Sequence, residues 1–386
     1  MTGFAPASAG ERRIGFVTRN FPPLMGGMER LNLHAFKALS ETSSVSLCAP
    51  SGAGVHASSR LCAELPLSPL PRFLVAAQWG AFKVAQRFRP HLFYSGSGLT
   101  APAILAAAKS CGAETACFLH GLDLVAQHPV YRGIFLPAIR RMDRILVNSH
   151  HTARLAVEVG VTEGKISILH PGVDVPQLMH RKSAAQQFRS ELGLGDAPVV
   201  LSAGRLTQRK GLASFIQSSL PQIVAKYPDV RLVVAGGEPA NALQHRGGVR
   251  ESIVAAARAV GLAGQVVLLG EVSDARLRDA YFAADVLVFP VLDLPGDVEG
   301  FGMVALEAAA HGTPTVAFGV GGVPDAVSEG VSGHLVATGN YEEFASRVVS
   351  ILAVRDSASS VMESCHGFAR EFSWDGFGQR LRHLLA

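Results

Sequence analysis

Two carboxylates eight residues apart have the types and spacing best suited to binding chemistry in this chain. Glu299 and Glu307 flank the segment Glu-Gly-Phe-Gly-Met-Val-Ala-Leu-Glu, in which Gly300 and Gly302 allow a ligand to approach the backbone closely. A helix that opens near Gly302 would direct its free N–H groups and the positive end of its dipole outward, which favours an anion. The segment therefore indicates a ligand with a central diphosphate and hydroxyl groups at both ends. The alternative is that Glu299 is a solvated loop acid and Glu307 caps a neighbouring element.

Two cations occur in a second segment, Ser-Ala-Gly-Arg-Leu-Thr-Gln-Arg-Lys-Gly at residues 202–211. Arg205 and Lys210 stand five residues apart, after a predicted strand and before a predicted helix. Open α/β sheets bind ligands beyond the carboxyl ends of their strands. A guanidinium fork and an ammonium point charge there can balance a pyrophosphate, although basic residues are also common in solvated loops.

The sequence has no pattern typical of a metal site. It lacks an Asp-x-Asp pair, and no histidines and acids cluster at metal-ligand spacing. We therefore expect metal-independent chemistry and no resident cofactor, with Arg205, Lys210 and the helix start neutralising a departing diphosphate.

Short apolar runs alternate with helical segments along the chain, and the pattern restarts after a polar stretch at residues 175–191. Strands are predicted at 13–18, 45–49, 91–95, 115–119, 144–148, 198–203, 231–235, 266–269, 286–290 and 315–318. Helices are predicted up to residue 40 and at 73–87, 102–109, 212–226, 253–260, 275–284 and 302–311. This alternation predicts an α/β protein of two doubly wound, Rossmann-like domains, 1–176 and 177–370, each with a parallel sheet covered by helices on both faces.

Composition excludes several protein classes. The chain has 386 residues, which at roughly 100–200 residues per domain is enough for about two domains. Charged residues make up 17% and apolar residues 48%, so a disordered chain is excluded. Five cysteines form no Cys-x-x-Cys pair and are predicted to be buried thiols of a reducing compartment: Cys48, Cys62, Cys111, Cys117 and Cys365. Residues 1–10 lack the features of a secretory signal, and no apolar run reaches the roughly 20 residues of a membrane span, so we expect a cytoplasmic protein.

The positive charge is concentrated in the first half of the chain. Residues 1–177 hold 17 Lys and Arg against 10 Asp and Glu, a balance of +7, whereas the remainder holds 18 against 21, a balance of −3. The net charge of +4 is too small to predict a nucleic-acid partner. Within this half, residues 71–89 mix aromatic and basic side chains, which suits either a helix on the inner face of an anionic membrane or a core helix with a solvated basic edge.

Taken in order, several motifs resemble those of glycosyltransferase family 4. They are Gly26-Gly-Met-Glu-Arg30, His120-Gly-Leu-Asp123, Gly204-Arg-Leu-x-x-x-Lys-Gly211, Glu299-x7-Glu307, His311-Gly-Thr-Pro314, Gly321-Gly-Val-Pro-Asp325 and Phe372-Ser-Trp-Asp375. The resemblance implies a retaining nucleotide-sugar transferase of GT-B fold, whose two Rossmann-like domains face each other across a cleft. It also implies that a C-terminal helix, 371–386, returns to the first domain.

The resemblance assigns roles to particular residues. As catalytic residues, Glu299 would contact hydroxyl groups of the donor sugar, His120 would touch that sugar near its reacting face, and Arg205 and Lys210 would hold the diphosphate. Glu307 would contact the ribose. The implied donor-binding residues are Gly26, Gly27, Arg205, Lys210, Glu271, Val272, Gly300, Phe301, Gly302, Met303 and Glu307.

The implied reaction is the transfer of a hexose or N-acetylhexosamine from a UDP- or GDP-sugar to a glycan or lipid-linked acceptor, in surface polysaccharide or glycolipid biosynthesis. Two alternatives stay open. One is a sugar-nucleotide epimerase on the same fold, although its type lacks the spacing of Glu299 and Glu307. The other is a non-catalytic nucleotide-sugar-binding subunit of a polysaccharide assembly complex, against which the presence of Arg205, Lys210 and Glu299 argues.

Overall fold

The computed structural model describes residues 11–57, 61–238 and 248–386, and it describes only the backbone at residues 61 and 62. The chain divides into two compact units. An N-terminal unit comprises Met1–Gly172 and Trp374–Ala386, and a C-terminal unit comprises Val173–Ser373. The division thus falls after Gly172 and after Ser373, whereas the sequence pattern placed it after residues 176 and 370.

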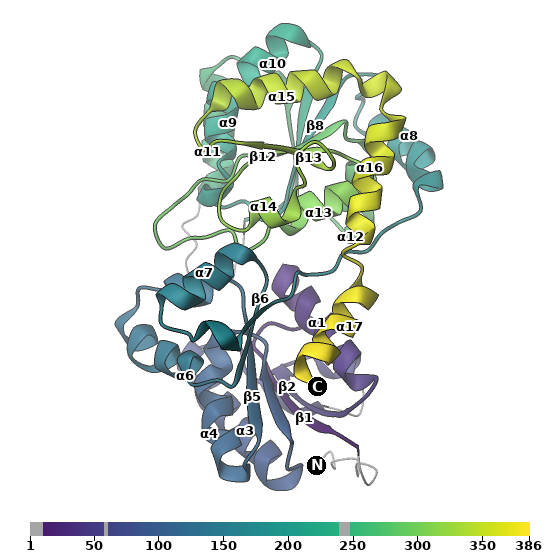
Figure 1. The fold of residues 1–386 in the computed structure, drawn as a ribbon. Helices are drawn as coiled ribbons and strands as arrows, with labels where there is room; N and C mark the ends of the chain where they lie inside the picture. Colours follow the sequence, from purple (N-terminus) through teal and green to yellow (C-terminus); the bar gives the residue numbers. More distant parts are fainter. Residues whose placement is uncertain (1–10, 58–60, 239–247) are drawn as a thin grey trace. The chain divides into compact units, whose positions relative to one another are not determined.

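The described part of the N-terminal unit forms a seven-stranded parallel sheet in the order β3-β2-β1-β4-β5-β6-β7. Strands β1, β2, β5 and β6 are labelled in Figure 1. Its strands are β1 Arg13–Val17, β2 Ser44–Pro50, β3 Leu61–Leu65, β4 Leu92–Ser95, β5 Glu114–Leu119, β6 Arg144–Val147 and β7 Ile166–Ile168. Its α-helices are α1 Gly27–Ser40, α2 Gly54–Ala57, α3 Leu70–Arg87, α4 Ala101–Cys111, α5 Leu122–Val125, α6 Leu136–Arg140, α7 His150–Glu158 and α17 Trp374–Leu385. The C-terminal helix α17 packs on α1, where the Trp374 indole stacks on the His34 ring with centroids 3.9 Å apart.

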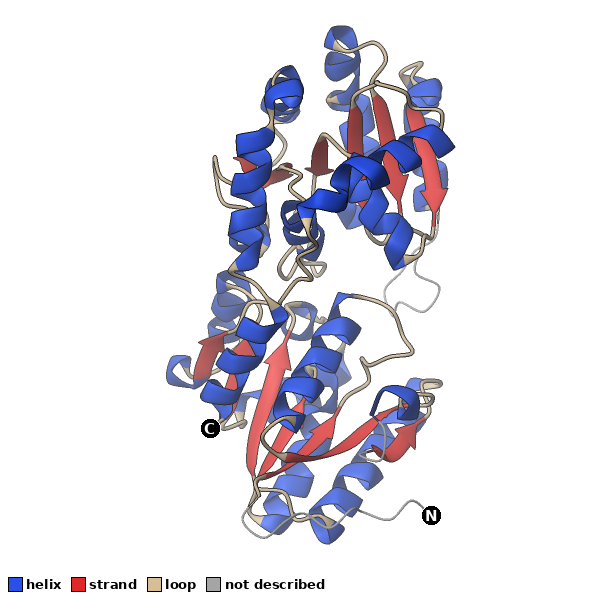
Figure 2. Cartoon of the chain, turned by 90° about the vertical axis from the view of Figure 1, so that its right-hand side faces the viewer, coloured by secondary structure: helices blue, strands red, loops and turns tan. Residues whose placement is uncertain are grey.

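The C-terminal unit repeats this plan with a six-stranded parallel sheet among its described residues, in the order β10-β9-β8-β11-β12-β13. Its strands are β8 Val199–Ala203, β9 Arg231–Ala235, β10 Val266–Gly270, β11 Val286–Phe289, β12 Thr315–Phe318 and β13 Gly333–Val336. Its α-helices are α8 Arg181–Glu191, α9 Leu212–Ser218, α10 Leu220–Lys226, α11 Val249–Ala259, α12 Asp274–Ala283, α13 Met303–Ala310, α14 Val323–Ala326, α15 Tyr341–Ala353 and α16 Ser359–Arg370. Helices lie on both faces of the sheet (Figure 2).

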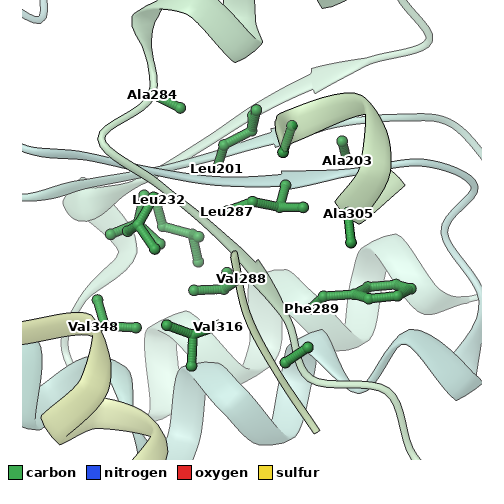
Figure 3. Packing of buried hydrophobic residues seen from close by; sticks show 14 of the residues in the cluster. Leu201, Ala203, Leu232, Ala284, Leu287, Val288, Phe289, Ala305, Val316 and Val348 are labelled. Atoms are coloured by element: carbon green, nitrogen blue, oxygen red, sulfur yellow. The ribbon is translucent and has the colours of Figure 1, made fainter. Parts of the chain in front are cut away.

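The core of the C-terminal unit is built by its central strands. Leu201, Leu287 and Val316 are completely buried, and their strands read as nearly continuous apolar runs because helices cover both faces of a parallel sheet. Figure 3 shows these side chains packed together with Ala305 of α13 and Val348 of α15. This core fixes the strand ends from which the site loops leave.

The α/β class with two doubly wound sheets is confirmed by these topologies. The sequence prediction missed several helices, including α15 and α16, and one predicted helix was wrong. The polar stretch at 175–191 contains the amphipathic helix α8, whose Phe188 is buried. The single helix predicted at 212–226 is two helices, since Ser219 donates a hydrogen bond to the Tyr341 carbonyl (2.8 Å) and Pro221 stands at the start of α10.

Three edge strands, β3, β7 and β13, were missed. All three residues of β7 are only half-buried, as are the two central residues of β13, so neither strand needs the apolar run that marks a central strand. Among the described cysteines, Cys48, Cys117 and Cys365 are buried as expected, whereas Cys111 is half-buried. Within the described residues, no helix is both long and apolar enough to cross a membrane, and residues 1–10 lie outside the description.

Candidate active site

The loop after β8 carries the cations predicted to bind a diphosphate. Arg209 and Lys210 lie in a short 3-10 turn, Gln208–Lys210, which Gly211 ends with a φ of +67°. A Cβ atom at Gly211 would lie 2.0 Å from the Pro290 carbonyl oxygen, so only glycine lets this loop pack against the end of β11. The loop therefore brings its cations to the carboxyl ends of the two central strands.

Two cations of this turn share one carboxylate. Lys210 Nζ donates to Glu299 Oε2 at 2.8 Å, and Arg209 donates to the same oxygen through one terminal nitrogen. Arg209 Nε also donates to Asp297 Oδ1 at 2.8 Å. The side chains of Arg209, Lys210 and Glu299 are only 10%, 16% and 13% exposed, so these ion pairs are largely shielded from water. We call these four residues the ion cluster.

Burial and charge oppose each other at Glu299. Burial alone would raise the pKa of its carboxyl, but the charges and hydrogen bonds of Lys210 and Arg209 outweigh it and hold the pKa at about 2. Burial lowers the pKa of the Lys210 ammonium, while the Glu299 charge opposes that shift. The ammonium also lies 4.3 Å from the centroid of the Phe289 ring, a cation–π arrangement. Glu299 is therefore an ionised acceptor at neutral pH.

A glycine pair fixes the backbone that carries Glu299. The Gly322 N–H donates to the Glu299 carbonyl at 2.8 Å. A Cβ atom at Gly321 would lie 2.5 Å from that carbonyl oxygen, and one at Gly322 would lie 2.0 Å from the Gly300 oxygen. The Gly-Gly-Val-Pro motif at 321–324 thus positions the site loop through close backbone packing.

Helix α13 follows this loop and carries the second carboxylate. It begins at Met303 after Gly302, whose φ of +101° suits glycine. Glu307 Oε2 accepts a hydrogen bond of 2.9 Å from the Tyr281 hydroxyl, and Tyr281 is only 2% exposed. His311 Nδ1 lies 2.7 Å from the Glu307 carbonyl oxygen, to which it must donate, and burial lowers the pKa of His311 to about 4. Glu307 is therefore held by a buried phenol next to a neutral histidine.

The other predicted donor-site residues of this unit differ in exposure. Arg205 is exposed. Burial is the main cause of the lowered pKa of the Lys210 ammonium, and the charge of Arg205 adds to it. Glu271 is exposed and Val272 half-buried, directly after β10. Phe301 is 3% exposed and packs in the core, so any contact that it makes with a donor is through its backbone.

In the N-terminal unit, the predicted glycine pair stands where α1 begins. Gly26 precedes the helix with a φ of +153°, and a Cβ atom there would lie 2.4 Å from Glu29 Oε2. Glu29 in turn accepts a hydrogen bond of 2.7 Å from Asn20. Gly27 is the exposed first residue of α1. Since neither Gly26 nor Gly27 has a side chain, neither can cover the first-turn N–H groups of this helix.

His120 follows β5, and hydrogen bonds fix both its ring and its backbone N–H. Its Nε2 lies 3.0 Å from the Gly96 carbonyl oxygen, to which it must donate, so Nδ1 carries the lone pair in the neutral ring. The His120 N–H donates to Asp123 Oδ2 at 3.0 Å, and the Gly98 N–H donates to Asp123 Oδ1 at 3.1 Å. Burial raises the pKa of the Asp123 carboxyl. His120 itself is 8% exposed.

Four residues of these sites were missed by the sequence prediction: Arg209, Asp297, Tyr281 and Asp123. Asp123 and Arg209 lie inside motifs quoted from the sequence and could have been found there. Arg209 and Asp297 are 88 positions apart, and Tyr281 lies 26 positions before Glu307, so no local pattern connects them.

Comparison with known proteins identifies the family. Residues 25–177 match the model described as Glycosyltransferase Family 4, and residues 197–354 match the model described as Glycosyl transferases group 1. Both halves of the chain thus match glycosyltransferase models. This confirms the resemblance inferred from the motifs.

Relatives within this group include the D-inositol 3-phosphate glycosyltransferases of Mycobacterium leprae (strain Br4923) and Segniliparus rotundus. The first is 35% identical over 237 residues, which cover 60% of this chain and 52% of the relative. The second is 32% identical over 239 residues, which cover 61% of this chain and 50% of the relative. The chain thus spans about half the length of these relatives.

Solved structures with the family's GT-B fold superimpose on almost the whole chain. Anabaena Alr3699/HepE in complex with UDP matches with a TM-score of 0.78 at 18% identity, over 97% of this chain and 99% of that one. Sucrose-phosphate synthase from Thermosynechococcus elongatus matches with a TM-score of 0.76 at 20% identity, over 97% and 98%. At these identities the likeness establishes the fold.

Proposed function

We propose that the chain is a retaining glycosyltransferase that moves a hexose or N-acetylhexosamine from a UDP- or GDP-sugar to a glycan or lipid-linked acceptor. The observation that carries the proposal is the ion cluster, in which Lys210 and an ionised Glu299 meet beside the start of α13. A diphosphate requires cations, and sugar hydroxyls require an acceptor, so this pairing suits the two halves of a nucleotide-sugar. The complexes of Anabaena HepE with UDP and with UDP-glucose support a UDP-sugar as donor.

In the proposed reaction, Lys210 and the exposed Arg205 stabilise the negative charge of the departing nucleoside diphosphate. Glu299 accepts hydrogen bonds from sugar hydroxyls and orients the ring. Glu299 is a poor nucleophile because its carboxylate is held by two cations. The departing phosphate takes the acceptor proton on the same face of the sugar, so the configuration at the anomeric carbon is retained.

We also propose that the reaction needs no divalent metal and no other cofactor. Arg205, Lys210 and the N-terminus of α13 supply positive charge at the place where a metal-dependent transferase uses Mg²⁺ or Mn²⁺. EDTA should leave the transfer rate unchanged. A tenfold loss of rate that Mn²⁺ restores would contradict this proposal.

The test of the proposed function is an assay of nucleoside diphosphate release from UDP-, GDP-, ADP- and dTDP-sugars. Candidate acceptors include D-inositol 3-phosphate, because the relatives are named for it. We expect release with one donor, and a product whose anomeric configuration, read by NMR, equals that of the donor. Binding of a donor with neither hydrolysis nor transfer would instead support the non-catalytic subunit of an assembly complex. An inverted product would contradict retention.

A basic face on α3 supports a membrane-presented acceptor. Val75 and Trp79 are 59% and 66% exposed, next to the exposed cations Arg72, Lys83 and Arg87. The other aromatic side chains of this segment are covered: Phe73 is buried, and Phe82 and Phe88 are half-buried. We propose that this face binds the inner surface of an anionic membrane reversibly, which would localise the protein as a peripheral cytoplasmic enzyme.

Vesicle co-sedimentation tests the membrane proposal. Anionic vesicles should retain the protein at low salt and release it at high salt, since salt screens the attraction of Arg72, Lys83 and Arg87 to the lipid. Trp79→Ser should weaken retention, and Val354→Ser, an exposed apolar residue of the other unit, is the matched control. Equal, negligible binding to neutral and anionic vesicles would remove the support for a membrane partner and favour a soluble acceptor.

A further inference from the structure

The charges of the ion cluster cancel one another. Arg209 and Lys210 contribute two positive charges, and Asp297 and Glu299 contribute two negative charges. Without Arg209, the Lys210 ammonium would be the only cation of the cluster beside two carboxylates. The cluster would then be negative and would repel a diphosphate. Arg209 is not among the residues that the family resemblance assigns to donor binding.

The Arg209 side chain is held by the loop that carries both acids. Its side chain is 10% exposed, and its nitrogens donate to Asp297 and Glu299. Its backbone oxygen accepts a hydrogen bond of 2.8 Å from the Leu292 N–H, at the start of the loop that carries both acids. Arg209 thus fastens this loop at its beginning and at its end.

Lys210 has a different position in the cluster. It is held by Glu299 and by the Phe289 ring, and it shares Glu299 Oε2 with Arg209. If a diphosphate attracts the ammonium, Glu299 loses one of its two cations. Because the carboxylate is largely shielded from water, it must keep the other cation to remain ionised in place.

We propose that Arg209 is a positioning residue that neutralises Asp297 and Glu299, so that Lys210 can bind the donor diphosphate while Glu299 stays ionised and oriented. The inference rests on the proposed function, because it requires a donor that carries a diphosphate. Arg209 acts through Lys210 and Glu299 and makes no contact with the donor.

The cluster offers a charge series that separates this role from simple support of the fold. Arg209→Met changes the cluster charge from zero to −1, and Asp297→Asn changes it to +1. Combining the two substitutions returns it to zero. Dissociation constants for UDP, GDP, ADP and dTDP are measured on each protein by calorimetry, at low and at physiological salt.

We expect Arg209→Met to bind the preferred nucleoside diphosphate on the order of ten- to a hundredfold more weakly than the wild type, because one uncompensated negative charge faces the anion at short range. Adding Asp297→Asn should restore most of that affinity. Asp297→Asn alone should bind at least as tightly as the wild type. A structural role would give no such rescue, since the double variant lacks even more of the native contacts.

Arg209→Lys keeps the charge but lacks the fork that reaches both acids. It should bind the nucleoside diphosphate to within about threefold of the wild type, yet show a lower kcat with the full donor because Glu299 is held less firmly. Arg347→Met is the matched control, because it removes a surface ion pair with Glu343 on α15 of the same unit. Circular dichroism and thermal unfolding report whether each variant folds.

The outcomes are distinguishable. If the wild type binds none of the four nucleotides, the proposed function and the inference both fail. If it binds one, but Arg209→Met binds equally well or the double variant stays as weak as Arg209→Met, the inference is overturned and the proposed function stands. If Arg209→Met does not fold, Asp297→Asn still decides, because weaker binding by that variant would contradict the charge balance.

Discussion

The polar residues that follow the sheet strands are held in place differently in the two units. At the carboxyl ends of β8 and β11, Lys210 and Glu299 are fixed by ion pairs among largely buried side chains. At the carboxyl ends of β4 and β5, the His120 ring donates to the Gly96 carbonyl, and Asp123 accepts from the backbone N–H groups of His120 and Gly98. One region is organised by charge and the other by backbone hydrogen bonds.

This difference has consequences for function. Charges interact over several ångströms in a shielded site. A change of charge at one member of the ion cluster therefore alters the electrostatic energy of the others. A hydrogen bond to the backbone fixes the direction of one ring and has little effect beyond it. We therefore expect substitutions in the charged region to have larger effects, and effects that depend on pH and salt.

The largest effect is expected at the ammonium of the charged region. Lys210→Ala should lower kcat/KM by roughly two to four orders of magnitude, because it removes a preorganised positive charge from the leaving group. Steady-state kinetics with the preferred donor measures it. Lys226→Ala, at the exposed end of α10, is the control. A folded Lys210→Ala variant with activity close to that of the wild type would remove the contrast between the two regions.

The charged region should also make stability depend on pH. The pKa of Glu299 is lowered from 4.5 to about 2 in the folded chain, so its stabilising effect is complete above pH 4.5 and is lost as the pH falls towards 2. The wild type should therefore lose about 3 kcal/mol more than Glu299→Gln over this interval. Denaturant unfolding from neutral pH to about pH 3 tests this over most of the interval. Parallel curves would show that Glu299 is not held as an ion.

A smaller effect is expected in the region organised by hydrogen bonds. His120→Ala should lower kcat by about one to two orders of magnitude, since it removes the ring that the family resemblance assigns to the donor sugar. The affinity for the nucleoside diphosphate should be unchanged. Kinetics and calorimetry on the same protein check both values. A loss of nucleotide affinity as large as that of Lys210→Ala would contradict the assignment of His120 to the sugar and of Lys210 to the diphosphate.

The smallest effect is expected at Tyr281. Tyr281→Phe removes only the hydroxyl that donates to Glu307, so the donor KM should rise about three- to tenfold with kcat nearly unchanged. Tyr341→Phe, a half-buried tyrosine of the same unit, is the control. An equal loss in kcat and kcat/KM would assign Tyr281 to the transition state instead.

The sequence predicted the central strands of both sheets because they are nearly continuous apolar runs such as Val-Leu-Val-Phe in β11. It missed β7, whose residues are only half-buried at the sheet edge, and α8, whose composition is mostly polar. The periodicity of a strand or a helix weakens when only part of its surface is covered.

Some residues of the candidate site could also be predicted from the sequence, and others could not. Glu299, Glu307, Arg205 and Lys210 could be proposed from local motifs, because glycines and charges stand at fixed spacing within one segment. The roles of Arg209 and Tyr281 could not be predicted, because their partners lie far away in the chain and meet them only after β8, β11 and α12 have packed. Long-range contacts of this kind leave no local pattern.

The most direct test of the central claim is thermal unfolding of the wild type and of Lys210→Ala with UDP, GDP, ADP and dTDP. A nucleotide at a hundredfold excess over its dissociation constant adds about 2.7 kcal/mol to the stability of the protein that binds it. We expect one nucleotide to raise the melting temperature of the wild type and to have little or no effect on Lys210→Ala. Equal shifts in both proteins, or no shift in the wild type, would contradict a diphosphate site built on Lys210.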